Sequence, residues 1–158
     1  MEQKGKELKV SAIENGTVLD HIPATQLFKV INILDLSHCQ HPITFGTNLD
    51  SKLLGKKAII KISGKYFKDE ELNRIALVAP LANANIIKDY EVVEKKKITI
   101  PDRIEGIARC SNPKCVTNHQ PIKSIFTTIR QNNGSIKLHC HYCEKDTPIE
   151  NVEVISVL

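Results

Sequence analysis

Four cysteines near the C-terminal end have the residue type and spacing of a metal site. Cys110 and Cys115 are separated by four residues, Cys140 and Cys143 by two, and 24 residues lie between the two pairs. Each close pair can present two thiolates from one turn, and two such turns form the tetrahedral sulfur cage that Zn²⁺ prefers. The spacing therefore predicts one zinc ion with four cysteine ligands. Two chance pairs or redox dithiols are the alternatives.

A zinc ion held by four thiolates is expected to be structural. A catalytic zinc keeps one coordination position open for water, whereas four thiolates close the sphere. The zinc deaminase signature needs a glutamate two residues after a histidine, and none of the six histidines has one. His119, His139 and His141 lie close enough in sequence to replace a cysteine ligand, but with four cysteines present we interpret them as surrounding residues. Cys39 is interpreted as a packed apolar residue rather than a nucleophile.

A second chemical pattern lies in the first hundred residues, where lysines alternate along a predicted strand. In the segment 57–62, Lys57 and Lys61 share one face because strand side chains alternate with period two. Two ammonium groups on one face can meet a polyphosphate, although a solvated strand face is the alternative. Asp20 and His21 precede Pro23 and can bond a ribose or base, or form a turn. No glycine-rich phosphate loop is present.

The elements that position these residues follow from hydrophobic period and turn signals. Asn15-Gly16 predicts a turn between extended segments 8–12 and 17–22, and the apolar spacing over 24–36 predicts a helix. Two strands follow at 43–49 and 57–62. A second helix is predicted from an N-cap at Asp69 to a stop at Pro80, and then one long strand at 84–95. This order predicts an α+β fold whose N-terminal part is a ferredoxin-like (split βαβ) antiparallel sheet with two helices.

The composition changes after a connector at 98–101. All four paired cysteines and several short β-prone runs lie beyond it, so a small all-β, zinc-ribbon-like domain is predicted at 101–158, after a first domain at 1–100. The second part carries seven basic and six acidic residues, and four thiolates with one Zn²⁺ bring its formal charge to about −1. This charge is unfavourable for a nucleic-acid-binding zinc ribbon and favours a protein-facing one.

Composition excludes several classes of protein. The 158 residues are 41% hydrophobic and 25% charged, which is typical of a folded globular protein and excludes a disordered chain. The first twenty residues are too charged for a signal peptide, and no apolar run approaches the roughly 20 residues of a membrane span. Together with an odd number of cysteines, these features predict a cytoplasmic protein without a membrane partner.

Five sequence blocks resemble the regulatory chain of aspartate carbamoyltransferase, in order and over nearly the whole chain. The blocks are GTVLDHIP at Gly16–Pro23, ALVAP at Ala76–Pro80, DYEVV at Asp89–Val93, RIEGIARC at Arg103–Cys110 and CHYCEK at Cys140–Lys145. The resemblance implies a noncatalytic subunit whose first domain binds CTP, ATP and in some members UTP as allosteric effectors. It further implies a zinc domain that docks on the catalytic chain, a regulatory homodimer, and a role in pyrimidine biosynthesis.

The resemblance also implies a nucleotide site, residue by residue. One side of base and ribose would be lined by Val10, Ala12, Ile13, Asp20 and His21, the opposite side by Asn85, Ile87, Tyr90 and Val92, and the triphosphate would meet Lys57, Lys61 and Lys95. Strand parity places Val92 and Lys95 on opposite faces, so a bulge or a strand end is expected between them. Ser11, Ser111 and Lys114 depart from residues that family members often carry.

Two functions from other classes compete with this interpretation. A ferredoxin-like RNA binder joined to a zinc ribbon would offer stacking aromatics in its central strands, but the chain has three Tyr, four Phe and no Trp, thinly scattered. An enzyme in its own right would need a paired acid and base, an open metal site or an activated nucleophile, and none is identified in the sequence. We therefore expect no nucleic-acid partner and no catalytic residue.

Overall fold

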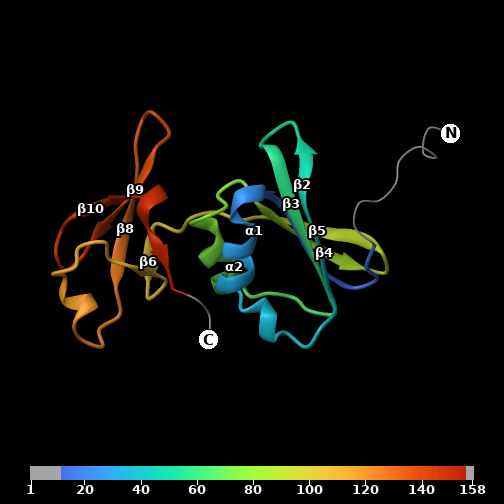
Figure 1. The fold of residues 1–158 in the computed structure, drawn as a ribbon, viewed down its shortest axis with the longest axis horizontal. Helices are drawn as coiled ribbons and strands as arrows, with labels where there is room; N and C mark the ends of the chain where they lie inside the picture. Colours follow the sequence, from blue (N-terminus) through green and yellow to red (C-terminus); the bar gives the residue numbers. More distant parts are fainter. Residues whose placement is uncertain (1–11, 156–158) are drawn as a thin grey trace.

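Five antiparallel strands form the larger sheet of the computed structural model, which describes residues 12–155 (Figure 1). Their spatial order is β2–β3–β1–β4–β5. The strands are β1 (Gly16–Pro23), β2 (Ile43–Ser51), β3 (Gly55–Ser63), β4 (Asn83–Lys88) and β5 (Glu91–Lys97). The first four are arranged as in a split βαβ, ferredoxin-like sheet, and β5 adds one edge strand. The predicted α+β class is confirmed.

Two short helices cover one face of this sheet. In α1 (Leu27–Ile33) the residues Leu27, Val30 and Ile33 recur at helical spacing and are buried, and in α2 (Asp69–Ala76) the buried residues are Leu72, Ile75 and Ala76. They pack with the inward side chains of β1 and β3 in one core cluster. In the part of the chain that the structure describes, neither helix is long and apolar enough to cross a bilayer.

The ends of both helices differ from the sequence prediction. The first is shorter than 24–36, because a 3-10 turn (Ala24–Gln26) precedes α1, and a second 3-10 turn (Leu36–His38) follows Asp35, whose φ is 53°. The predicted N-cap at Asp69 is wrong by one residue. Lys68 is the N-cap, and its backbone N–H donates to the Glu71 carboxylate at 2.9 Å. Asp69 begins the helix, where a carboxylate is favoured by the helix dipole.

The predicted turn at Asn15-Gly16 leads into β1, whereas the strand predicted before it falls mostly outside the described residues. Of segment 8–12 the structure describes Ala12, and residues 12–15 form no strand. Gly16 pairs with Ser63 on one side and Ile87 on the other, at a φ of 142°. A Cβ at this position would lie 2.1 Å from the Ile62 carbonyl oxygen, so only glycine fits.

The predicted single strand at 84–95 is wrong, because the chain reverses there as the β4–β5 hairpin. Its two turn residues, Asp89 and Tyr90, both have positive φ (53° and 67°), as in a type I′ turn. The turn lacks the glycine that would have signalled it in the sequence. Hydrogen bonds to distant residues hold it: the Tyr90 N–H donates to the Glu14 carbonyl at 2.9 Å and the Asp89 N–H to Asn15 Oδ1 at 3.2 Å.

The C-terminal part is all-β, as predicted. A four-stranded sheet has the order β10–β9–β8–β6, and a two-stranded sheet joins β7 and β11. Its strands are β6 (Arg103–Glu105), β7 (Ala108–Arg109), β8 (Ile125–Arg130), β9 (Ile136–Cys140), β10 (Asp146–Pro148) and β11 (Glu153–Val154). Ile104, Phe126 and Leu138 fill its interior. Figure 1 shows α1 and α2 between this part and the larger sheet.

The connector between β5 and β6 is packed rather than loose. Ile98 and Ile100 are 3% and 6% exposed and belong to the same buried cluster as the helices. The guanidinium of Arg130 donates to the Ile100 carbonyl and to Asp102 Oδ1, the latter at 2.6 Å, and Thr128 Oγ1 donates to the Pro101 carbonyl at 2.7 Å. The end of the connector that leads into β6 is therefore tied to β8.

Candidate functional sites: a four-cysteine cluster and an open sheet face

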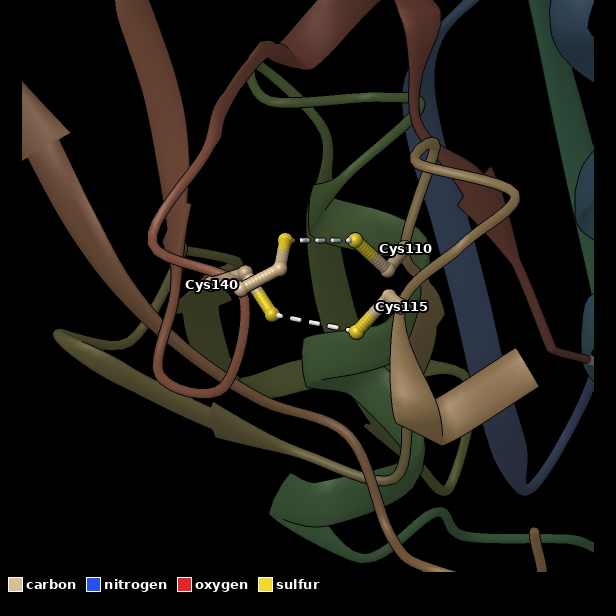
Figure 2. A group of neighbouring side chains, drawn as sticks. Cys110, Cys115 and Cys140 are labelled. Atoms are coloured by element: carbon tan, nitrogen blue, oxygen red, sulfur yellow. Dashed lines mark hydrogen bonds between the residues drawn. The ribbon is translucent and has the colours of Figure 1, made fainter. Parts of the chain in front are cut away.

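The four paired cysteines converge on one point in the C-terminal part. Their sulfur atoms all lie within 4.8 Å of one another, with 3.7 Å between Cys110 and Cys143 and 3.8 Å between Cys115 and Cys140. Figure 2 shows Cys110 and Cys115 approaching Cys140 from the opposite side of the cluster. With Zn–S bonds of about 2.3 Å, the edge of a tetrahedral ZnS₄ site is about 3.8 Å. The donor set and its dimensions therefore fit zinc.

Two tight turns present these thiols. Cys110 directly follows β7, and the Cys115 N–H donates to the Asn112 carbonyl at 3.0 Å, which closes the first turn. Cys140 ends β9, and the Glu144 N–H donates back to its carbonyl at 3.0 Å, which closes the second. The Asn118 side-chain amide donates to the carbonyls of Cys110 and Asn112 at 3.0 and 2.8 Å, so it ties both sides of the first turn together.

Without a metal the cluster is a set of thiols with divergent acidity. Burial raises the pKa of Cys110 to about 12 and also raises the pKa of Cys140. At Cys143 burial acts in the same direction, but hydrogen bonds from the Asn112 side chain and the Lys145 backbone outweigh it and lower the pKa to about 7. Metal ligation requires thiolates, so Zn²⁺ must displace protons that burial holds on these sulfurs.

The histidines near the cluster have other partners. His119 Nε2 lies 2.6 Å from the Pro113 carbonyl oxygen, and His139 Nδ1 lies 2.6 Å from Asp146 Oδ1. The ring of His141 packs edge-on against Tyr142, with 5.1 Å between centroids. Cys39 is half-buried and packs against the core of the larger sheet. Among residues 12–155, the group of side chains placed to hold a metal ion therefore consists of the four paired cysteines, without a histidine.

Ser111, in the turn between the first two cysteines, has a structural partner. Ser111 Oγ lies 2.6 Å from Thr147 Oγ1, and this contact joins the first cysteine turn to β10. Thr147 is buried, so the contact gives a polar group in the interior the hydrogen bond that it needs. Lys114 is exposed, and its backbone N–H donates to Asn112 Oδ1 at 3.1 Å.

A second group of predicted residues lies on the face of the larger sheet that the helices leave uncovered. The strand register sets Lys61 of β3, Val18 of β1, Asn85 of β4 and Lys95 of β5 side by side across four strands. Directly opposed residues in a sheet point to the same face. A lateral row with an ammonium group at each end and an amide between them therefore crosses the open face.

The pair Asp20 and His21 reaches this face through a bulge in β1. The register shifts between Leu19 and Ile22, which are both buried, and His21 has a φ of 60°. A bulge places an extra residue in a strand, so both adjacent side chains can lie near the open face. Asp20 Oδ1 lies 3.0 Å from Lys57 Nζ and 2.6 Å from the His21 N–H.

The other residues predicted to line the nucleotide site lie in three places. Ala12 and Ile13 precede β1, Ile87 pairs with Gly16 and Val92, and Tyr90 lies exposed at the β4–β5 turn. Val10 lies outside the described residues. The register shifts at Ile86 and Ile87, so that Ile86 pairs with Glu94 and Ile87 with Val92. This β-bulge at Val93 resolves the conflict of parity between Val92 and Lys95, as expected.

The sequence prediction missed two residues of the open face. Asn83 pairs with Asp20 of β1 and Lys97 of β5, in the row next to that of Asn85. Its side-chain amide nitrogen lies 3.2 Å from His21 Nδ1. The signal was present in the sequence, because Asn83 and Lys97 have the same strand parity as Asn85 and Lys95. It required the hairpin to be identified first.

Comparisons with known proteins agree with these features. The profile of the aspartate carbamoyltransferase regulatory chain, allosteric domain, matches residues 8–99, and that of the same chain's metal binding domain matches residues 102–153. The aspartate carbamoyltransferase regulatory chain of Bacteroides fragilis is 52% identical over 155 residues, which cover 98% of this chain and 100% of the relative. That of Pyrococcus abyssi is 49% identical over 154 residues, covering 96% and 99%.

The two matched segments correspond to the two groups of features described above. The first profile covers the five-stranded sheet with its open face, and the second covers the four cysteines that come together as a metal-type cluster. Both profiles describe a regulatory chain rather than a catalytic one. The chain therefore belongs to the family of aspartate carbamoyltransferase regulatory chains.

Proposed function

We propose that residues 1–100 form an allosteric domain that binds a nucleoside triphosphate on the open face of the five-stranded sheet. The observation that carries this proposal is the lateral row in which Lys61 and Lys95 flank Asn85. A triphosphate needs several cationic donors, and a base needs amide and carbonyl groups beside them. This face offers both, and no helix of the described chain covers it.

The charged groups on this face favour a phosphate-binding site over the alternative, a strand face that only contacts solvent. Burial lowers the pKa of Lys61, while the negative charge of Asp20 opposes that shift. A nearby anion favours the charged form of an ammonium group, so a bound phosphate would offset this shift. Lys57 is held by Asp20 at 3.0 Å, which also orients that carboxylate beside His21. Phosphates would meet Lys57, Lys61 and Lys95, and ribose or base would meet Asp20 and His21.

The effectors that we propose are CTP and ATP, with UTP as a third nucleotide, as expected for this family. To act allosterically, a nucleotide must bind two states of the assembled enzyme with different free energy, typically by about 1 to 3 kcal/mol. The partners that this requires are the aspartate carbamoyltransferase catalytic chain and a second regulatory chain in a homodimer. Their pathway is pyrimidine biosynthesis, and the compartment is the cytoplasm.

Residues 101–158 are proposed to form the second domain, which docks on the catalytic chain. Cys110, Cys115, Cys140 and Cys143 would hold one structural Zn²⁺, since four thiolates leave no coordination position for water. The metal would fix the two turns that carry the cysteines. Their outward residues, including the exposed Tyr142 and Lys114, are then held in place for a protein partner.

The decisive experiment is calorimetric titration of the zinc-loaded full chain with CTP, ATP and cytidine, using neighbouring lysines as a matched pair. Lys95 lies on the open face, whereas Lys96 faces the helices and lies 3.3 Å from Asp69 Oδ1. Both substitutions to alanine remove one positive charge. We expect Lys95→Ala to weaken triphosphate binding about tenfold, and Lys96→Ala to change it little.

The uncharged nucleoside separates phosphate contacts from base contacts. Cytidine should bind more weakly than CTP and respond little to Lys95→Ala, because it has no phosphate. Equal loss of CTP affinity in both lysine variants would show only a general charge effect and would contradict the assignment. Tight, salt-sensitive binding of single-stranded RNA would instead support the nucleic-acid alternative, although β1, β3 and β4 contain no Phe, Tyr or Trp.

A further inference from the structure

The side chain of Asn83 makes an unusual contact on the open sheet face. Its amide nitrogen lies 3.2 Å from His21 Nδ1, across the β1–β4 pairing in which Asn83 opposes Asp20. Its amide oxygen is buried and has no hydrogen-bond partner among residues 12–155. A buried polar atom without a partner is rare in proteins and calls for a cause. Because that oxygen has no partner, the contact with His21 is the hydrogen bond that orients the Asn83 amide among the described residues.

The chemistry of the two groups fixes the direction of the hydrogen bond. An amide nitrogen donates and has no lone pair to accept with, whereas a neutral imidazole has one donor nitrogen and one acceptor nitrogen. In the observed orientation Nδ2–H of Asn83 donates to Nδ1 of His21. The remaining proton of the neutral ring must then lie on Nε2, which makes that atom a donor.

The neighbouring carboxylate does not compete for the same nitrogen. Asp20 Oδ2 is 3.9 Å from His21 Nδ1, beyond hydrogen-bond distance, and Asp20 Oδ1 accepts from the His21 backbone N–H and from Lys57. The Asp20 carboxylate therefore has other hydrogen-bond partners and does not bind the ring of His21. Asn83 is left as the hydrogen-bond partner that selects between the two neutral forms of the ring.

We propose that Asn83 is a positioning residue that holds His21 in its Nε2–H form, so that the site presents a hydrogen-bond donor to an acceptor oxygen or nitrogen of the ligand. The part concerning the ligand rests on the proposed nucleotide-binding function. Asn83 acts through His21 and lies in the row beside that of Lys61, Asn85 and Lys95. Asn83 contributes to recognition of the nucleoside, whereas the lysines contribute to binding of the phosphates.

The test reverses the hydrogen-bonding polarity of residue 83 at constant size. Asn83→Asp replaces the amide donor by a carboxylate, which only accepts, so it should favour the Nδ1–H form. Asn85→Asp is the matched control, because it adds the same charge two residues away on the same face. Long-range ¹⁵N–¹H NMR spectra of the zinc-loaded full chain at about pH 8.5, two units above an ordinary histidine pKa, report which ring nitrogen carries the proton. The His21 signals are assigned with His21→Gln.

We expect Nε2–H in the wild-type chain and in Asn85→Asp, and Nδ1–H in Asn83→Asp. If Asn83→Asp does not fold, Asn83→Ala removes the donor without adding charge and should give a mixture of both forms. An Nδ1–H ring in the wild type, or the same form in every variant, would overturn the proposal. This measurement uses no nucleotide, so it can succeed even if the proposed function fails.

A binding measurement then addresses the ligand. Titration with the uncharged nucleoside avoids the charge of the triphosphate, and we expect Asn83→Asp to weaken its binding about tenfold, as for loss of one hydrogen bond to a neutral group. Unchanged nucleoside affinity despite a reversed ring form would overturn the role of His21 Nε2–H in recognition. Absence of binding to the wild type would count against the nucleotide site itself.

Discussion

A single glycine decides how β1 begins in the larger sheet. Gly16 has a φ of 142°, and an added Cβ would lie 2.1 Å from the Ile62 carbonyl oxygen. The clash is with backbone of the neighbouring strand, which cannot rotate away. We expect Gly16→Ala to destabilise the chain by about 2 to 4 kcal/mol, measured as the free energy of unfolding in urea.

Gly55 is the matched control for this substitution. It also has a positive φ, of 81°, but a Cβ added there would meet no atom within 4 Å, so only backbone strain remains. We expect Gly55→Ala to cost about 1 kcal/mol. Equal losses at both positions would mean that φ alone matters and that the close approach of β1 to β3 does not.

Individual site residues were predictable where their chemistry is local in sequence. The four cysteines were found from spacing, because two tight turns each supply a pair of ligands. Lys57 and Lys61 were paired by strand parity. The approach of Asp20 and His21 to one face was not predictable from parity, since it depends on a bulge between β1 and β3. The contact between Asn83 and His21 joins residues 62 positions apart and needs the strand register.

Among the elements, the β4–β5 turn has a sequence that is unfavourable for its own backbone geometry. A type I′ turn prefers Asn-Gly, whereas this one holds Asp89 and Tyr90 at positive φ. Tyr90 is 66% exposed, so its side chain contributes little packing. We expect the double substitution Asp89→Asn, Tyr90→Gly to stabilise the chain by about 1 kcal/mol, a rise of about 2 to 4 °C in Tm measured by circular dichroism.

The control variant carries similar substitutions at the strand residues next to the turn. Lys88→Asn with Glu91→Gly introduces glycine at a position with ordinary strand geometry, where it should destabilise by about 1 kcal/mol. A lower Tm for the turn variant would show that Tyr90 contributes more to stability than its exposure suggests.

Element prediction succeeded where period and turn signals coincided. Strands β2 and β3 and both helices were found, with errors at their ends. The hairpin β4–β5 was missed because its turn has neither glycine nor proline. Hydrogen bonds that its backbone N–H groups donate to Glu14 and Asn15 stabilise it. That stabilisation is tertiary. It cannot be read from the segment itself.

At the scale of the whole molecule, the metal is expected to control one part of the chain more than the other. Structural zinc sites bind with about 10 kcal/mol or more, comparable to the entire stability of a small domain. We expect chelation of zinc to remove hydrogen-exchange protection from the amides of β8 and β9. The strands β1 and β3, whose core is formed with α1 and α2, should retain theirs.

Two cysteine variants provide the matched comparison for zinc content. Cys143→Ser removes a member of the cluster, whereas Cys39→Ser removes a thiol that packs against the larger sheet. Metal analysis of the purified chains should give one zinc per chain for Cys39→Ser and substantially less for Cys143→Ser. Equal zinc in both would contradict the four-cysteine site.

The position of the connector bears on how the chain can be divided into fragments. Ile98 and Ile100 are buried in the cluster that also contains side chains of both helices, and Arg130 of β8 binds the Ile100 carbonyl. A cut between the two matched segments would leave apolar side chains at a new chain end and remove the guanidinium that satisfies that carbonyl. Fragments ended at this junction would therefore tend to self-associate, and a recombinant N-terminal half would need polar replacements at both isoleucines to stay monodisperse.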